Sequence, residues 1–458
     1  MLVFLPSKKI AALLPQSSYW ESTLLQGATK SYLQFPETDS SNNIYCVSSL
    51  DTGALGLCKY NSAGVLQWVR SMSGSSNPTA VIVRVSDSAV FVLSSSSTAS
   101  TVNNAGKIAA NLFKYDHSGN LIWKFAYGTG SISSVSYDVA LTNDGHLYMS
   151  LHTPPAVGGS TPLILKLNST TGDIVWQRRL GANCTDSISI AADGSGNCYA
   201  TARSYQGSTT EPPILVKISA AGAFMWGRRF HTAGYYRYAD AVRVTPAGDV
   251  LLTYRQTQSN TYVISVFTTK YTSEGVFLWD VEAYGLDSSS STDGKIAVDS
   301  QNNSFMLSSM SNSYYPAVTK GALLSLDANG ATRFNNGLET SETSVNYGFA
   351  GRHLTVNHSD EPVLTAYHNS QVVANSAFLL MSMRSDGARI RNSSDTRRSV
   401  TTSRVITRAP RLSEIAGATY TIGVYESTPT VAKGISPLVD SAIALESFTS
   451  STGPLQTY

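Results

Sequence analysis

The sequence predicts an all-β protein in which four-stranded antiparallel units repeat around a closed ring, a single β-propeller. Three observations predict it. A glycine-turn hairpin recurs with a mean period of about 54 residues, a second strand–turn–strand phrase lies between the copies, and no stretch shows sustained helical periodicity. Four short strands in a unit of this length match a propeller blade and exclude a helical solenoid.

The hairpin phrase is clearest in residues 164–179, where a strand, a turn ending at Gly172 and a second strand carrying Trp176 follow one another. Glycine supplies the positive φ that such a turn needs. Seven copies are marked by their turn glycine: Gly64, Gly119, Gly172, Gly222, Gly275, Gly330 and Gly387. Tryptophan follows four residues later in five copies, and a sixth lies in residues 18–27, which resemble the same strand: Trp68, Trp123, Trp176, Trp226, Trp279 and Trp20. These indoles are expected to pack between neighbouring sheets.

Five copies also carry a lysine before the turn glycine: Lys59, Lys114, Lys166, Lys217 and Lys270. Because each lies on a strand with alternating apolar neighbours, we expect the stems to pack and the ammonium groups to reach water. A lysine repeated in five units is not a unique catalytic base.

The second phrase completes the unit. It has an apolar strand, an Asp/Asn/Gly turn and a strand centred on an aromatic residue, as in residues 42–46 and 144–148. Each unit therefore has strands A and B around this turn, and strands C and D around the turn glycine.

The two ends of the chain predict how the ring closes. Residues 18–27 resemble a D strand without its unit, and residues 400–440 resemble A, B and C strands without a D strand. An N-terminal strand that completes a C-terminal blade would leave no open edge, which gives eight blades. If residues 395–458 are an appendage, the ring has seven. Residues 1–458 are then one domain, with the repeat ring at 18–440 and extensions at 1–17 and 441–458.

The composition excludes several function classes. Charged residues make up 14 % of the chain and the formal net charge is +2, so no overall field attracts nucleic acid or acidic membranes. No apolar run approaches the roughly 18 residues of a membrane helix, so membrane insertion is not expected. The first lysines follow a very short apolar run, which is the wrong order for a secretory signal.

The phrase Lys-Leu-Asn-x-x-x-Gly-Asp-Ile-Val-Trp-Gln-Arg resembles the tryptophan-docking repeat of quinoprotein-type (PQQ-like) β-propellers over about residues 18–440. The resemblance implies a propeller, and in the dehydrogenases of that family an axial ligand ring, a calcium site and often adjacent cysteines. The sequence has no Cys-Cys pair and no assignable carboxylate set. We therefore expect no catalytic residue, no cofactor and no metal site, and the chain is not expected to be an enzyme.

The remaining reactive side chains are expected to have structural roles only. The histidines lie singly, and the Asp-rich turns lack the closing acid of a calcium loop. Cys46 and Cys58, like Cys184 and Cys198, flank a strand connection, and we expect reduced thiols, with cross-strand pairing in an oxidising medium as the alternative.

One segment is strongly basic. Residues 384–411 contain eight arginines against Asp386 and Asp395. The arginine fork suits carboxylate or phosphate partners, so this segment is the candidate interaction surface for an acidic face of a neighbouring subunit. Solvated arginines are the alternative, and nucleic acid is not favoured because no aromatics interleave. The candidate interaction residues are Arg389, Arg391, Arg397, Arg398, Arg404 and Arg408.

Low charge and abundant Ser, Thr, Asn and Tyr favour a non-enzymatic structural or interaction propeller. The specific hypothesis is a tailed-bacteriophage virion component, in the tail, a fibre or a decoration, made in the host cytoplasm. Its expected partners are other protein subunits in a symmetric assembly and a host-surface receptor. The alternatives are a quinoprotein-like propeller enzyme and an envelope-associated assembly scaffold, located in the cytoplasm or exported by a non-classical route.

Overall fold

In the structure, a computed structural model, the described residues form β-strands and short turns, and none of them form a helix long and apolar enough to cross a membrane. The described residues are 21–24, 33–49, 55–72, 81–96, 109–127, 135–153, 161–180, 184–185, 189–204, 213–229, 235–258, 264–283, 291–311, 319–340, 348–369, 377–383, 385, 398–401, 405–406, 424–425 and 431–434.

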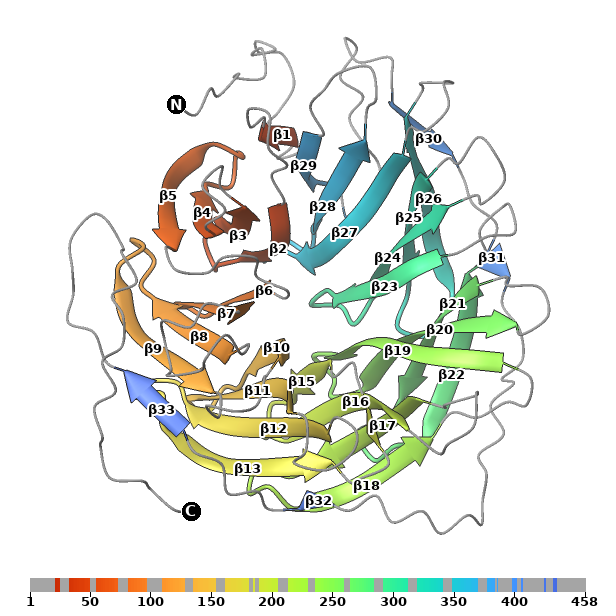
Figure 1. Ribbon diagram of the computed structural model, residues 1–458. Helices are drawn as coiled ribbons and strands as arrows, with labels where there is room; N and C mark the ends of the chain where they lie inside the picture. Colours follow the sequence, from red (N-terminus) through yellow and green to blue (C-terminus); the bar gives the residue numbers. More distant parts are fainter. Residues whose placement is uncertain are drawn as a thin grey trace.

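Hydrogen bonding divides the described strands into six sheets around a common centre, so the molecule is a six-bladed β-propeller (Figure 1). Blade 1 is formed by β2 (Leu33–Thr38), β3 (Ile44–Ser49), β4 (Leu55–Tyr60) and β5 (Leu66–Met72). Blade 2 is formed by β6 (Val81–Val85), β7 (Val90–Ser96), β8 (Ala109–Tyr115) and β9 (Leu121–Tyr127). Blade 3 is formed by β10 (Val135–Leu141), β11 (His146–Thr153), β12 (Thr161–Asn168) and β13 (Ile174–Leu180).

Blades 4 and 5 continue the same antiparallel order. Blade 4 is formed by β14 (Cys184–Thr185), β15 (Ile190–Ala192), β16 (Cys198–Ser204), β17 (Pro213–Ile218) and β18 (Phe224–Arg229). Blade 5 is formed by β19 (Tyr235–Val244), β20 (Val250–Gln258), β21 (Ile264–Tyr271) and β22 (Phe277–Ala283).

Blade 6 is a double sheet with two four-stranded halves. The first half is formed by β23 (Ser291–Val298), β24 (Ser304–Ser311), β25 (Thr319–Leu326) and β26 (Thr332–Thr340). The second half is formed by β27 (Gly348–Val356), β28 (Pro362–Asn369), β29 (Ala377–Ser382) and β1 (Glu21–Leu24). One parallel pair, Thr319 with Gly348, joins the two halves into a single hydrogen-bonded sheet.

The expectation of eight blades, with seven as the alternative, is therefore wrong. The sixth and seventh repeats share one sheet through that parallel pair. Residues 400–440, from which an eighth blade was expected, supply no sheet of their own in the described part of the chain. Their short strands instead join the outer edges of separate blades: β30 (Arg398–Thr401), β31 (Val405–Ile406), β32 (Val424–Tyr425) and β33 (Val431–Gly434).

The N-terminal strand closes the ring at a different unit from the expected one. β1 pairs antiparallel with β29, from Glu21 opposite Met381 to Leu24 opposite Phe378. It is the outer strand of the last half-blade, so segments from both ends of the chain share one sheet and the edge of β29 is covered. Trp20 lies outside the described residues.

The hairpin turns form for local reasons. In blade 2 the N–H of Gly119 donates to the Asp116 carbonyl, and the Asp116 carboxylate accepts the N–H groups of Ser118 and Asn120. The turn glycine has positive φ, and it also lies against the preceding blade. At Gly330, where φ is 85°, an added Cβ would meet the Trp279 ring at 2.8 Å. Glycine is therefore needed both for the turn and for the close approach.

Each hairpin is held by the blade before it. Trp176 Nε1 and Lys166 Nζ, both from blade 3, donate to the same carbonyl, that of Ala220 in the next hairpin, at 2.9 and 3.2 Å. Arg178 covers the Trp176 ring and donates through Nε to Gly222 O at 2.7 Å. The tryptophan and lysine share one acceptor in the same way at Ser169, Ser273 and Ala328.

Three of the five repeat lysines are buried, contrary to the expectation that their ammonium groups reach water. The side chains of Lys166, Lys217 and Lys270 are only 4–5 % exposed. The neighbouring blade supplies the carbonyl that compensates for burying the charge, and a strand pattern from one blade cannot show that partner. Burial lowers the pKa of the Lys114 ammonium.

The hydrophobic cores lie between adjacent blades. One core joins Phe91 and Phe125 of blade 2 to Leu147 and Leu165 of blade 3. Another joins Tyr148 and Trp176 of blade 3 to strands of blade 4. Because every blade is covered on both faces, the first strands are fixed around the centre, where the polar side chains described next converge.

Candidate functional site

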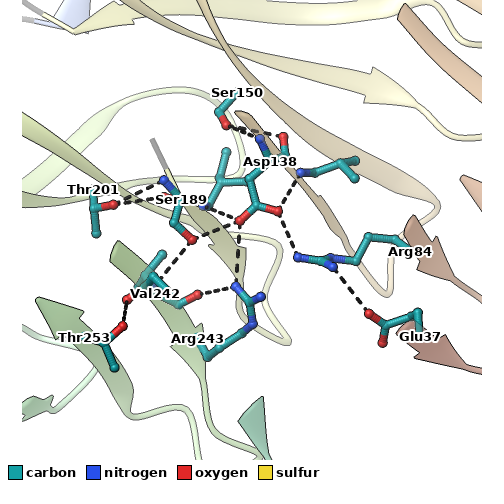
Figure 2. Close-up of polar contacts among 12 residues, drawn as sticks. Glu37, Arg84, Asp138, Ser150, Ser189, Thr201, Val242, Arg243 and Thr253 are labelled. Atoms are coloured by element: carbon teal, nitrogen blue, oxygen red, sulfur yellow. Dashed lines mark hydrogen bonds and ion pairs between the residues drawn. The ribbon is translucent and has the colours of Figure 1, made fainter. Parts of the chain in front are cut away.

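A cluster of charged side chains lies on the first strands of the blades, around the propeller axis (Figures 1 and 2). Register shifts interrupt several of these strands, between Gln34 and Glu37 in β2 and between Ser136 and Asp138 in β10. A bulge leaves a residue outside the regular ladder and redirects its side chain. The shifts in β2 and β10 therefore accompany two carboxylates, Glu37 and Asp138, near the axis.

Asp138 is the centre of this cluster. Its carboxylate, whose side chain is only 6 % exposed, accepts the N–H of Val139 at 2.9 Å and the N–H of Ile190 at 3.2 Å. The hydroxyl of Ser189 donates to it at 2.9 Å, and Arg84 Nη2 donates to it at 2.8 Å (Figure 2). Four donors from three blades thus bind this carboxylate.

Arg84 connects Asp138 to Glu37. Its Nη1 lies 3.3 Å from Glu37 Oε2, and the Thr355 hydroxyl donates to Glu37 Oε1 at 3.3 Å. Arg243 Nη1 lies 3.7 Å from Asp138 Oδ2 and donates to the carbonyl of Val242 at 2.8 Å. Two carboxylates and two guanidinium groups balance one another in charge.

Burial shifts the protonation equilibria of the cluster. Burial raises the pKa of the Glu37 carboxyl, and the attraction of Arg84 and Arg243 opposes this without cancelling it. Burial likewise lowers the pKa of the Arg243 guanidinium, aided by repulsion from Arg84. Glu37 is also bound by fewer donors than Asp138.

A layer of hydroxyl groups on the second strands supports the bulges. Ser150 Oγ accepts the N–H of Asp138 at 3.0 Å, and Thr201 Oγ1 accepts the N–H of Ser189 at 3.2 Å. Thr253 Oγ1 donates to Gly294 O of the next blade at 2.9 Å. These hydroxyls, all buried, satisfy backbone groups that the irregular first strands leave outside the ladder.

Blade 5 repeats the arrangement with a second carboxylate. Asp240 Oδ1 accepts Arg255 Nε at 2.9 Å, and Asp240 Oδ2 accepts the N–H of Gly294 in blade 6 at 3.1 Å. Asp138 and Asp240 thus perform the same task, in which a carboxylate on one first strand holds backbone N–H groups of the next. The arrangement connects adjacent blades at the axis.

The sequence-predicted site residues lie elsewhere. Trp123 and Trp176 are buried between blades, at 3 % and 9 % exposure, and Trp68, Trp226 and Trp279 are half-buried. Of the arginine-rich segment only Arg398 falls within a described strand, β30. Residues outside the described part of the chain are Trp20, Gly387, Arg389, Arg391, Arg397, Arg404 and Arg408.

The other reactive groups form no centre in the described residues. Cys46 and Cys58 are free and buried, and they lie directly opposite each other on neighbouring strands. Cys184 and Cys198 do not face each other, since in the strand register they lie opposite Ser204 and Ile218. Within the same residues, no group of three or more His, Cys, Asp or Glu side chains is placed to hold a metal ion.

The axial residues were not singled out from the sequence. A usable signal existed: Arg84 and Asp138 are each the only charged residue in their strand, as in Val-Ile-Val-Arg-Val. Charged side chains are rarely buried unless they are paired. Which charges pair across blades depends on the bulges, and the sequence pattern does not reveal these.

Known proteins resemble this chain in structure rather than in sequence. No family model matches the chain, and no curated protein matches it significantly. Similar solved structures include an ulvan lyase of a polysaccharide lyase family, with TM-score 0.48 and 8 % identity over 76 % of this chain and 94 % of that chain. They also include the β-propeller domain of the Trilobed protease from Pyrococcus furiosus, with TM-score 0.44 and 11 % identity over 77 % of this chain and 95 % of that chain.

Proposed function

We propose that the chain is a non-enzymatic interaction propeller and a structural component of a tailed-bacteriophage virion, where it contacts other protein subunits. One observation carries the non-enzymatic part: the central carboxylate is occupied by the fold itself. Asp138 accepts two backbone N–H groups, a hydroxyl and a guanidinium. A general base or nucleophile needs a lone pair directed at a substrate, and these contacts direct the lone pairs of Asp138 into the protein.

The outer strands supply an interaction surface. Four consecutive blades expose an apolar side chain three residues after the turn glycine, and we name Ile122, Val175, Met225 and Leu278 the apolar arc. Each is 40–49 % exposed. A single exposed apolar residue needs no explanation. An apolar residue exposed at the same position in consecutive blades favours a protein partner that packs along the outer side. In the blades at the two ends of the arc, the residue three positions after the turn glycine is polar: Gln67 and Arg333.

The assignment to a virion rests on composition. Charged residues are 14 % of the chain, against about 25 % in ordinary soluble domains. Ser, Thr, Asn and Tyr replace them, which suits a repeat scaffold whose polar surface is largely uncharged. The host-surface receptor that such a component would contact is part of the same proposal.

The test is a mass-spectrometric inventory of purified phage particles, followed by incorporation of variants. Replacing Ile122, Val175 and Met225 by serine should lower incorporation at least about tenfold, since the three side chains together lose more than the 1.4 kcal/mol that a tenfold change requires. The matched control is Gln67→Ser at the same step of blade 1, which should incorporate like the wild type. Absence of the chain from purified particles would overturn the virion assignment. Normal incorporation of the triple variant would overturn the role of the arc.

A second candidate, an axial enzyme of the quinoprotein type or another propeller class, is favoured by Glu37. A half-buried carboxyl with a raised pKa beside an arginine is a common arrangement of general acids. Turnover with added quinone and calcium, or on acidic polysaccharides, that Glu37→Gln abolishes without unfolding the protein would favour this candidate over the scaffold.

A further inference from the structure

The C-terminal segment runs around the outside of the ring. Its short strands pair one after another with the outermost strands of different blades: β30 with β26, β31 with β22, β32 with β13 and β33 with β9. All four pairings are antiparallel. Figure 1 shows these blue strands on the perimeter of the propeller. The described tail strands thus pair with the blades in reverse chain order, and none of them pairs with β18.

The four pairings share one register. In blade 2 the paired residues include Ala126 and Tyr127, which lie seven and eight residues after the turn glycine Gly119. In the other three blades the tail also pairs with the residues seven and eight positions after the turn glycine. These are Arg179 and Leu180 after Gly172, Glu282 and Ala283 after Gly275, and Gly337 and Leu338 after Gly330. A repeated register on unrelated tail sequences shows that the outer edge itself is the recurring binding element.

The next edge along this path is that of β5. Strand β5 follows β9 in the direction of the tail, and among the described strands it pairs only with β4. Its seventh and eighth residues after Gly64 are Ser71 and Met72, which pair with Gly56 and Leu55 on their inner side. An outer edge of this kind leaves backbone N–H and C=O groups without a ladder partner.

The chain continues beyond β33 with enough residues to cover this edge. Five residues, 426–430, connect β32 on blade 3 to β33 on blade 2, and 24 residues of the sequence follow Gly434. After one connection of similar length, residues 441–449 read Ser-Ala-Ile-Ala-Leu-Glu-Ser-Phe-Thr. Large side chains alternate with small ones at Ile443 and Leu445, the pattern of a half-buried strand.

We propose that residues 441–449 bind the outer edge of β5 as an antiparallel fifth strand paired with Ser71 and Met72. This strand extends the belt by one blade beyond β9, so that the tail of the same chain holds the first blade as it holds blades 2, 3, 5 and 6. The β5 edge is then closed to strand addition by partner proteins, and the apolar arc is left as the outer surface for them.

The experiment is amide hydrogen exchange measured by mass spectrometry on the full chain, on a truncation after Gly434 and on the full-length double variant Ile443→Pro with Leu445→Pro. Proline removes the N–H groups that a ladder needs while leaving the rest of the chain unchanged. In both altered proteins the outward-facing amide of the Ser71–Met72 pair should exchange at least about tenfold faster than in the full chain. Ala126 and Tyr127, which β33 covers, should not change.

A matched variant outside the proposed strand, Thr452→Pro, should exchange like the wild type. Equal exchange at Ser71 and Met72 in the full chain and the truncation would overturn the proposal. Protection that is present in concentrated solution and lost on dilution would also overturn it, because the occupant would then be the tail of a second copy. Sedimentation at the same concentrations distinguishes these two results.

Discussion

The axis and the perimeter of this propeller are held together by different chemistry. At the axis, buried charges bind backbone groups of the next blade, as Asp138 binds the N–H of Ile190 and Asp240 binds that of Gly294. On the perimeter, indole and ammonium donors share a carbonyl of the next hairpin, and tail strands of two to four residues cover the sheet edges. The two axial carboxylates share this bond to the next blade but have different arginine partners, Arg84 and Arg255, whereas the perimeter repeats one set of donors in each hairpin. Changes at the axis should therefore act on single blade contacts, and changes on the perimeter should act alike in each blade.

The largest effect is expected where the perimeter closes the ring. Deleting residues 1–27 removes β1 and exposes the edge of β29 over four residue pairs. An open edge is a template for association with other chains, so the deletion should replace soluble monomer with aggregate. Size-exclusion chromatography and thermal melting measure this. An unchanged melting midpoint would show that the ring does not depend on this strand.

Trp176→Ala tests the repeated hairpin contact. The substitution removes a buried ring and the bond to Ala220 O, and should lower the free energy of unfolding by about 3–5 kcal/mol. The neighbouring exposed residue gives the control, since Val175→Ala should change stability by less than about 0.5 kcal/mol. Denaturant unfolding compares the two. Equal losses in both variants would contradict the packing role of the indole.

Asp138→Asn tests the axis. The amide keeps one acceptor oxygen but places an NH₂ group among donors, and Arg84 loses a charged partner. We expect a loss of about 2–3 kcal/mol, below the range for a fully buried pair because the Arg84 side chain is 16 % exposed. Asp87→Asn, in the exposed turn of blade 2, is the control. A double-mutant cycle with Arg84→Met should recover part of the loss, and strict additivity would contradict the pairing.

The difference between the two regions also explains what the sequence could predict. The hairpins were predictable because Gly119 and Asp116 act within one turn, and the repeat makes the same signal visible many times. The burial of Lys166 was not, since its acceptor lies on another blade. The blade number depended on the pair of Thr319 with Gly348, which joins two repeats, and on residues 400–440, whose strands are too short for their sequence to select a partner. The axial cluster depends on bulges, and a one-residue shift in register is invisible in an alternating pattern.

A pH measurement sharpens the comparison within the axis. Burial raises the pKa of Glu37 above its ordinary value of 4.5. A carboxyl with a raised pKa in the folded state contributes stability that is complete below its unfolded pKa and is lost as pH rises through the folded pKa. The stability of the wild type relative to Glu37→Gln should therefore fall as pH increases from 4.5 upward. Asp39 and Asp144, whose pKa values are lowered, titrate in the opposite sense but alike in both proteins, so they cancel in the difference. A difference that is flat with pH would show that Glu37 does not titrate in the folded protein under these conditions.

The smallest effect is expected from a single tail strand. Strand β32 covers Arg179 and Leu180 through two residues, Val424 and Tyr425. Replacing both by proline removes their N–H groups, whereas replacing both by alanine removes the same side chains and keeps the N–H groups. Since one or two exposed hydrogen bonds are lost, the proline variant should be less stable than the alanine variant by under about 1 kcal/mol. Amide exchange should nevertheless accelerate at Arg179 and Leu180 and nowhere on β9, because each tail strand covers its own edge. If exchange accelerated on β9 and β22 as well, the belt would be one cooperative element, and the perimeter would be coupled around the ring rather than blade by blade.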